Sequence, residues 1–160
     1  TADLIPTVVA HLAPHGRLAL IETIPREAQR LWDLVPIDGV NPQLRQRWQN
    51  AEEAIYTHTG DPRFSWDGKS LVHLLETAGL TVQGSQETVE SDLWVSEKLC
   101  DRWFDRANPE SYCSRLAHTL ASKDLVAIET ALRRRVQNQT VRWRSQQWAL
   151  LAFSSSADLN

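Results

Sequence analysis

Apolar residues recur along the chain in two spacings, one typical of helices and the other of short buried strands. Apolar runs and alternating stretches predict strands at Leu18–Ile24, Leu80–Val89 and Trp148–Phe153. The first strand opens with an unbroken apolar run, which is typical of a strand buried on both faces. From Ser96 to about residue 138 the spacing is helical. The pattern therefore predicts a single α/β domain, 1–160, with a helical insertion at about 96–138.

Capping residues and apolar stripes predict where the helices lie. Pro25 suits the first turn of a helix whose apolar stripe runs from Ala28 to Val35. Asn41-Pro42 is an N-cap followed by a proline, and it predicts a helix whose face includes Leu44, Trp48, Ala51 and Ile55. Asp67 is expected to cap another helix, which Gly79 ends. Within the insertion, Asn108-Pro109 and Ser122 predict two further helix starts.

Composition and charge narrow the class of protein without naming a partner. The chain has 160 residues, of which 42% are hydrophobic and 23% charged, and its net charge is −3. These values are typical of one soluble domain. The longest apolar run near either end is far shorter than the roughly 20 residues of a membrane span, so no membrane partner is expected. Two cysteines and no signal peptide favour a cytoplasmic protein.

The start of the chain is unusual. The sequence contains no methionine, and Thr1-Ala2-Asp3-Leu4 has the pattern of the interior of a helix. We expect the chain to be a fragment of a longer protein.

No motif predicts a catalytic, cofactor-binding or metal-ligating residue. The chain has no Gly-x-Ser-x-Gly elbow, no P-loop and no Gly-x-Gly-x-x-Gly loop. Cys100, Cys113 and His118 do not have the close cysteine pairs of a zinc site, and both cysteines lie on apolar helix faces.

Two groups of residues are candidates for binding. Glu22 ends the first strand, where open α/β sheets place their ligands, so it is a candidate for the substrate side of a site. The pattern favours the alternative that Glu22 is a solvated carboxylate just ahead of a helix N-terminus, where the helix dipole stabilises it. Arg142, Trp143 and Arg144 combine cations with an aromatic ring and are candidate nucleic-acid contacts.

Charge is unevenly spread around these arginines. Residues 115–145 contain seven basic and two acidic residues, a local +5, whereas residues 81–101 contain five acidic and one basic, a local −4. The arginines at 133–135 spread around their helix and complement its dipole, which favours a structural role for them. Trp66 and Trp143 lie outside the apolar stripes, and each is either a packing anchor or a partner contact.

Several segments resemble known proteins. The stretch from His11 to Pro25 resembles the helix end, turn and fifth strand of class I, S-adenosylmethionine-dependent methyltransferases, although His15 stands where that family has its first glycine. Trp66-Asp67 and Leu71 to Leu80 resemble the family's last helix and sixth strand, and the closing apolar strand resembles its seventh.

A closer resemblance covers nearly the whole chain. Five segments in order are similar to the methyltransferase-like C-terminal region fused to some bacterial, notably cyanobacterial, AAA-type ATPases of the replication-associated recombination group, the MgsA or RarA type. These segments are Thr23–Leu31, Ala51–Tyr56, Phe64–Asp67, Asp101–Phe104 and Ser111-Tyr112.

The resemblance implies a fold and an accessory function. The fold is a partial, Rossmann-like sheet of three mixed strands with flanking helices, in the order Leu18–Ile24, Trp148–Phe153, Leu80–Val89. The family's cofactor loops precede its fifth strand, so S-adenosylmethionine or ATP would bind upstream of this chain. The function implied is a non-catalytic accessory or interaction fragment of an ATPase of DNA replication and recombination. The alternatives are part of an active methyltransferase and a nucleic-acid-binding module.

The implied strand order also predicts partners. Strand Leu18–Ile24 would lie at an edge with no charge or proline in its apolar centre to discourage pairing. We expect this edge to be covered by the rest of the longer chain or to self-associate.

Overall fold

A computed structural model describes residues 4–57, 61, 63–64 and 66–154, which divide into two compact units. Unit 1 comprises residues 1–28, 61–89 and 145–160, and unit 2 comprises residues 29–60 and 90–144. The sequence pattern predicted a single domain, whereas each unit has its own hydrophobic core. The two longest strands, β2 (Leu80–Val95) and β3 (Gln139–Ser154), contribute residues to both units.

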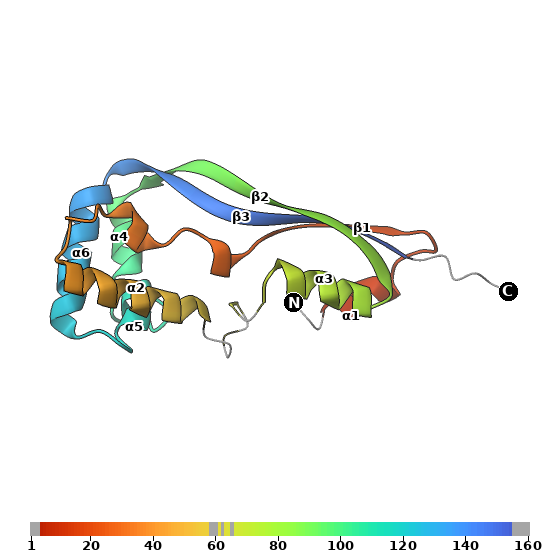
Figure 1. The fold of residues 1–160 in the computed structure, drawn as a ribbon, viewed down its shortest axis with the longest axis horizontal. Helices are drawn as coiled ribbons and strands as arrows, with labels where there is room; N and C mark the ends of the chain where they lie inside the picture. The colour runs from red at the N-terminus through yellow and green to blue at the C-terminus, as the bar shows by residue number, and fades with distance from the viewer. Residues whose placement is uncertain (1–3, 58–60, 62, 65, 155–160) are drawn as a thin grey trace. The chain divides into compact units, whose positions relative to one another are not determined.

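The three strands form one sheet in the order β1-β3-β2, which is the predicted order with the last strand in the middle (Figure 1). Strand β1 (Arg17–Thr23) pairs antiparallel with β3, so that Leu20 lies opposite Leu150. Contacts of β2 with β3 also run in opposite directions, from Gly84 beside Leu150 to Thr88 bonded to Gln146. The α/β fold class is therefore confirmed. Both strand pairings are antiparallel, because β3 runs against β1 and β2, so the expectation of a mixed sheet is wrong.

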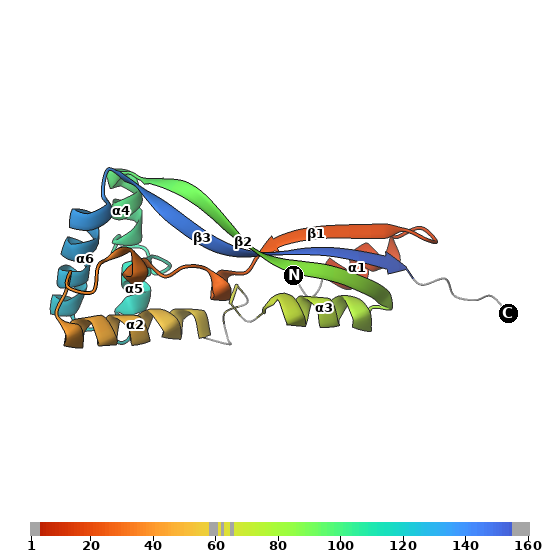
Figure 2. The ribbon, with the colours of Figure 1, turned by 45° about the horizontal axis from the view of Figure 1, so that its top comes forward.

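Helices α1 (Leu4–Ala10) and α3 (Gly68–Thr77) lie on the same side of the unit 1 sheet (Figure 2). The core between sheet and helices contains Ile5, Leu71, Leu75, Leu80, Leu150 and Ala152. The prediction that the first strand is buried on both faces is wrong. Exposed and half-buried residues alternate along β1, and Ile21 is 73% exposed.

Helix α3 has the predicted ends. The Asp67 side chain accepts a hydrogen bond from the Ser70 amide at 2.8 Å, and the Ser70 hydroxyl accepts one from the Asp67 amide. The hydrogen bond from the Ser70 amide lowers the pKa of the Asp67 carboxyl group. Gly79 has a φ of 86°, which few other residues adopt, and it ends the helix. The helix expected at residues 1–3 lies outside the described residues.

Unit 2 contains the predicted helical insertion. Helices α4 (Glu97–Trp103), α5 (Tyr112–Leu116) and α6 (Ser122–Val136) lie between β2 and β3 in the sequence. Together with α2 (Pro42–Thr57) they enclose a core that includes Trp48, Cys100, Cys113, Leu116, Ile128 and Leu132. Asn41 caps α2 as predicted, since its Oδ1 accepts from the Leu44 amide at 2.7 Å.

The helix predicted from Pro25 to Val35 does not form. Two short 3-10 helices, η1 (Pro25–Glu27) and η2 (Leu31–Leu34), are present instead. Ala28 and Arg30 are extended between them, with ψ angles of 156° and 149°. The amides of Leu31 and Trp32 donate to the side chain of Glu52, so these two groups are satisfied without a helix.

Helix starts within the insertion differ by a few residues from the predicted ones. Helix α5 is capped by Ser111, because Asn108 instead accepts from the Glu110 amide in a turn. Helix α6 begins at Ser122 itself. Across the described residues, none of the helices combines the length and the apolar character that crossing a membrane requires.

Candidate interaction surface

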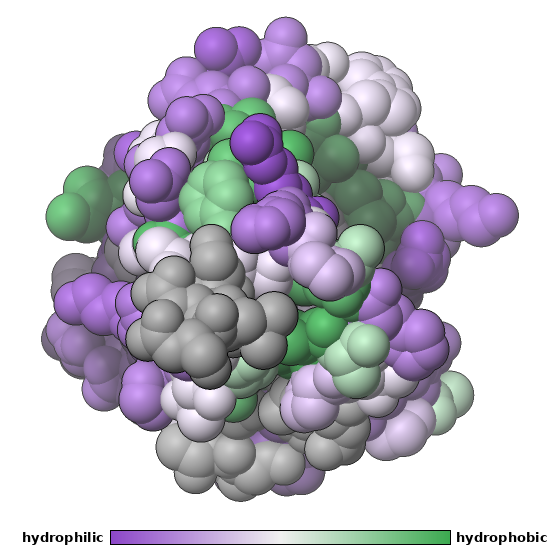
Figure 3. Space-filling view, turned by 90° about the vertical axis from the view of Figure 1, so that its right-hand side faces the viewer, coloured by the Kyte–Doolittle hydropathy of each residue, from purple (hydrophilic) through white to green (hydrophobic). Residues whose placement is uncertain are grey.

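The sheet of unit 1 is covered on one face only. Along β1 and β3, alternate side chains point away from α1 and α3, and we call the apolar ones the open face. The open face consists of Ala19 and Ile21 on β1 and of Ala149, Leu151 and Phe153 on β3. The register places Ala19 opposite Leu151 and Ile21 opposite Ala149, so these side chains form one patch. Figure 3 shows apolar surface, in green, among hydrophilic side chains on the side that it presents.

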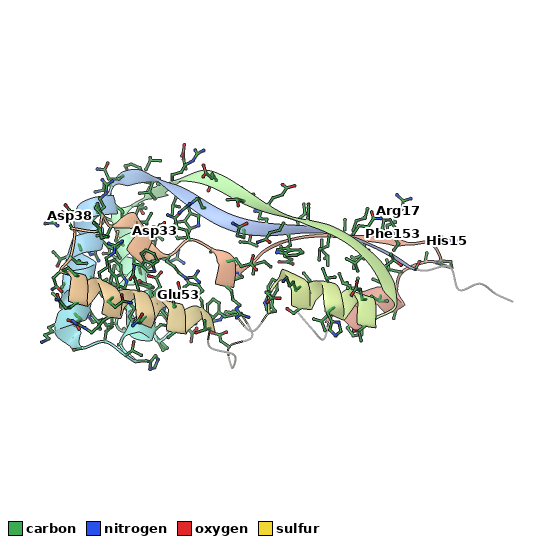
Figure 4. All side chains as sticks on the ribbon, viewed as in Figure 1. His15, Arg17, Asp33, Asp38, Glu53 and Phe153 are labelled. Carbon is green, nitrogen blue, oxygen red and sulfur yellow. The ribbon has the colours of Figure 1, made fainter. Side chains whose placement is uncertain are left out.

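Charged and polar residues border the open face. The Arg17 guanidinium lies 5.7 Å from the centre of the Phe153 ring, and Figure 4 shows these two side chains together. On β2, Gln83, Ser85 and Glu87 are exposed. An apolar centre with a polar rim is the composition typical of a protein contact surface.

The edge of β1 continues this surface. Among the described residues no strand pairs with β1 on the side away from β3. Proteins discourage pairing at such edges with charges, prolines or bulges, and the centre of β1, Leu18-Ala19-Leu20-Ile21, has no charge and no proline. The edge and the open face therefore form one candidate interaction surface.

Glu22 lies on the covered face and does not belong to this surface. It is half-buried and stands opposite Trp148 in the register. The ring of Trp148 packs on Gly68, where an added Cβ would lie 2.0 Å from the ring. In the part of the chain that the structure describes, the Glu22 side chain forms no hydrogen bond or ion pair, and no second candidate residue is brought to it.

The structure places Arg142, Trp143 and Arg144 within β3. Alternation along the strand separates them, because Trp143 packs against the core of unit 2 while both arginines are exposed. Trp143 is therefore a packing residue, and Trp66 likewise packs against the core of unit 1.

Both exposed arginines have acidic partners. Arg142 donates to Glu90 at 3.0 Å and to Asp92 at 3.1 Å, and these hydrogen bonds raise the pKa of its guanidinium. Arg144 donates to Asp33 at 2.9 Å. Arg142 thus pairs across the strands with the acidic segment of the sequence, whereas the partner of Arg144 lies on η2.

An exposed tryptophan lies near these pairs and was missed in the sequence. Trp94 on β2 is 57% exposed, whereas its neighbours Leu93 and Val95 pack toward the core of unit 2. Strict alternation over positions 93–95 is the signal that would have found it.

A buried acidic network in unit 2 was also missed. Glu52 is fully buried and accepts hydrogen bonds from the amides of Leu31, at 2.6 Å, and Trp32, at 3.2 Å. It also accepts one from the hydroxyl of Tyr112 at 2.6 Å, and the Tyr112 oxygen accepts from the indole N–H of Trp48. Desolvation raises the pKa of Glu52 to about 7 and raises the pKa of Tyr112 well above its ordinary value.

The geometry of the Glu52 network indicates that it stabilises the fold and does not bind a substrate. A carboxylate with no exposed surface cannot reach a substrate from solution, and its acceptors are already used by the chain itself. It fastens η2 and α5 to α2.

Metal-binding groups are not brought together in the described residues: no three histidine, cysteine or acidic side chains are placed to hold an ion. Cys100 and Cys113 are free thiols in the core of unit 2, and burial raises the pKa of both.

A polar hollow of about 330 Å³ lies in unit 2 beside Gln29, Asp33, Arg135 and Arg142. Its lining carries charges of both signs, so it does not select an anionic or a cationic ligand.

Comparison with known proteins does not place the chain in a family. A scan against protein-family models gave no match, and a search of curated proteins gave no match either.

Proposed function

We propose that this chain is a non-catalytic interaction module that accepts an extended strand at the edge of β1. The observation that carries the proposal is the combination of an edge strand whose apolar centre has no charge or proline and an apolar open face next to it. Strand addition at such an edge satisfies the backbone groups of both partners, and alternate side chains then supply specificity.

The proposed partner is the remainder of a longer protein. The strand order β1-β3-β2 agrees with the order implied by the resemblance to methyltransferase-like regions, in which a further strand lies beside β1. In this proposal the chain is an accessory part of a cytoplasmic AAA-type ATPase of DNA replication and recombination.

Photo-crosslinking at the open face tests the proposal. Replacing Ile21 with benzoylphenylalanine leaves the fold intact because the side chain is 73% exposed. In the natural protein, expressed in its own cells, we expect crosslinks from position 21 to one extended segment outside residues 1–160.

The matched control carries the same group at Val126, which is 51% exposed on α6 of unit 2. Crosslinks that are absent at position 21, or that equal those from position 126, would refute the interaction module.

A further inference from the structure

We infer that in the 160-residue chain on its own a second copy occupies the β1 edge, with the two β1 strands antiparallel and Leu20 opposite Leu20 of the second copy. This inference rests on the proposed function, because both require β1 to accept a strand. It goes further by naming the occupant and the register.

The length of β1 selects the register. Centring the pair on Leu20 places all seven residues from Arg17 to Thr23 opposite a residue of the second strand. Shifting the centre to Ala19 or to Ile21 leaves two residues of each β1 strand without a counterpart in the other. Every second residue of β1 points its amide and carbonyl to the free edge, and the centred register pairs more of these residues than either shifted register, so it forms the most complete hydrogen-bond ladder.

Symmetry then extends the apolar surface. A two-fold axis perpendicular to the sheet keeps both open faces on the same side and makes the contact self-complementary. In the centred register, Ile21 of each copy lies directly opposite Ala19 of the other. The two open faces join into a single apolar patch across the contact, which removes part of the exposed Ile21 from water.

The charges at the ends of β1 suit an antiparallel arrangement. The strand begins with the cation Arg17 and carries the anion Glu22 near its other end. Parallel in-register pairing would place each charge beside its like on the same face, whereas antiparallel pairing centred on Leu20 separates the like charges, with Arg17 opposite Thr23 and Glu22 opposite Leu18.

Cysteine pairing tests the register directly. We would prepare Ala19→Cys and Ile21→Cys as separate variants, mix them in equal amounts and oxidise them gently. Directly opposite Cβ atoms lie about 4.5–5.5 Å apart, close to disulfide geometry, whereas diagonal neighbours lie about 7–8 Å apart. The mixture should give the mixed disulfide dimer as its main product, and each variant alone should give little. The native cysteines do not interfere because both are buried.

Other cysteine products would overturn the register. A dimer formed by the Ala19→Cys variant alone would centre the pair on Ala19, and one formed by Ile21→Cys alone would centre it on Ile21.

Sedimentation equilibrium tests whether a second copy of the chain occupies the β1 edge. The wild-type chain should show a mass of twice 18.2 kDa at high concentration, and Ile21→Lys should be monomeric at every concentration, with the unfolding temperature of the dilute wild type. The control Val126→Lys should remain dimeric. A monomeric wild type would overturn the inference that a second copy occupies the β1 edge. The proposed function would remain if position 21 still crosslinks in the longer protein. Failure of both measurements would remove both claims.

Discussion

At the scale of single residues, Glu52 shows how a buried charge can organise a segment without taking part in chemistry. Its carboxylate binds two consecutive amides of η2 and the hydroxyl of Tyr112, so one side chain connects three segments of unit 2. Burial makes this arrangement sensitive to pH, because desolvation raises the pKa of Glu52 from 4.5 to about 7.

Glu52→Gln should remove a specific pH dependence of stability. Between about pH 4.5 and 7 the folded state keeps a proton on Glu52 that the unfolded state has released, so the free energy of unfolding falls as pH rises. The full fall is on the order of 3 kcal/mol. Denaturant titrations over this pH range should show it in the wild type and not in Glu52→Gln.

The matched control for this prediction is Glu53→Gln, which removes the neighbouring, half-exposed partner of Arg30. It should retain the pH dependence of the wild type. Parallel stability curves for the wild type and Glu52→Gln would show that Glu52 does not titrate in this range.

Gly68 is expected to tolerate no side chain. An added Cβ would lie 2.0 Å from Trp148, so Gly68→Ala must displace either the indole ring or the start of α3. We expect a loss of about 1–3 kcal/mol in the free energy of unfolding, measured by urea denaturation. Lys69→Ala, at the exposed next position, should change it by less than about 0.5 kcal/mol, and equal losses in both variants would contradict the packing argument.

At the scale of elements, the geometry of β3 determines whether Arg142, Trp143 and Arg144 can bind a nucleic acid. The strand separates Trp143 from its neighbouring arginines, and each arginine is paired with carboxylates of β2 or η2. Binding a phosphate backbone would require these pairs to be broken first, which weakens the case for a nucleic-acid module.

We therefore expect weak DNA binding or none. Submicromolar affinity for single-stranded DNA at about 0.15 M salt, lost in Arg142→Ala/Arg144→Ala, would contradict this expectation and support the nucleic-acid alternative. Because both arginines are exposed and their ion pairs are screened by solvent, the double variant should keep the fold. Its thermal unfolding therefore serves as the fold control.

Elements whose signals are local could be predicted from the sequence, whereas those that depend on distant partners could not. Helices α2 and α3 carry their own caps and stripes, and both form as predicted. Strands β2 and β3 were predicted too short, because Glu90, Asp92 and Arg142 resemble a solvated loop until cross-strand pairing neutralises them. The segment Pro25–Val35 was expected to be helical, but its amides at Leu31 and Trp32 bind Glu52 instead. Glu52 is distant in sequence and gave no local signal.

The candidate interaction surface was predictable only in part, because one of its two components has a local sequence signal and the other depends on distant elements. The unprotected edge of β1 is visible in its four apolar residues, but the open face requires knowing that both helices of unit 1 cover the same side of the sheet. The resemblance supplied the strand order, which the spacing of apolar residues alone does not determine.

At the scale of the whole molecule, the accessory role predicts the absence of cofactor binding by this chain alone. Methyltransferase sheets bind adenosine-containing cofactors in loops after their early strands, and in our proposal those strands lie upstream of these residues. Titration calorimetry with S-adenosylmethionine should give no one-to-one binding in the micromolar range. Such binding would instead support the alternative of a working methyltransferase with Glu22 near its substrate.

Hydrogen exchange of the β1 amides, followed by NMR, tests most directly whether this edge accepts another strand. In an antiparallel edge strand every second amide points outward and exchanges rapidly, because it has no partner. We predict this alternation between Arg17 and Thr23 in dilute solution and protection of all the β1 amides when concentration drives association. An alternating pattern that persists unchanged at every concentration, and also in the longer protein that we propose, would contradict it.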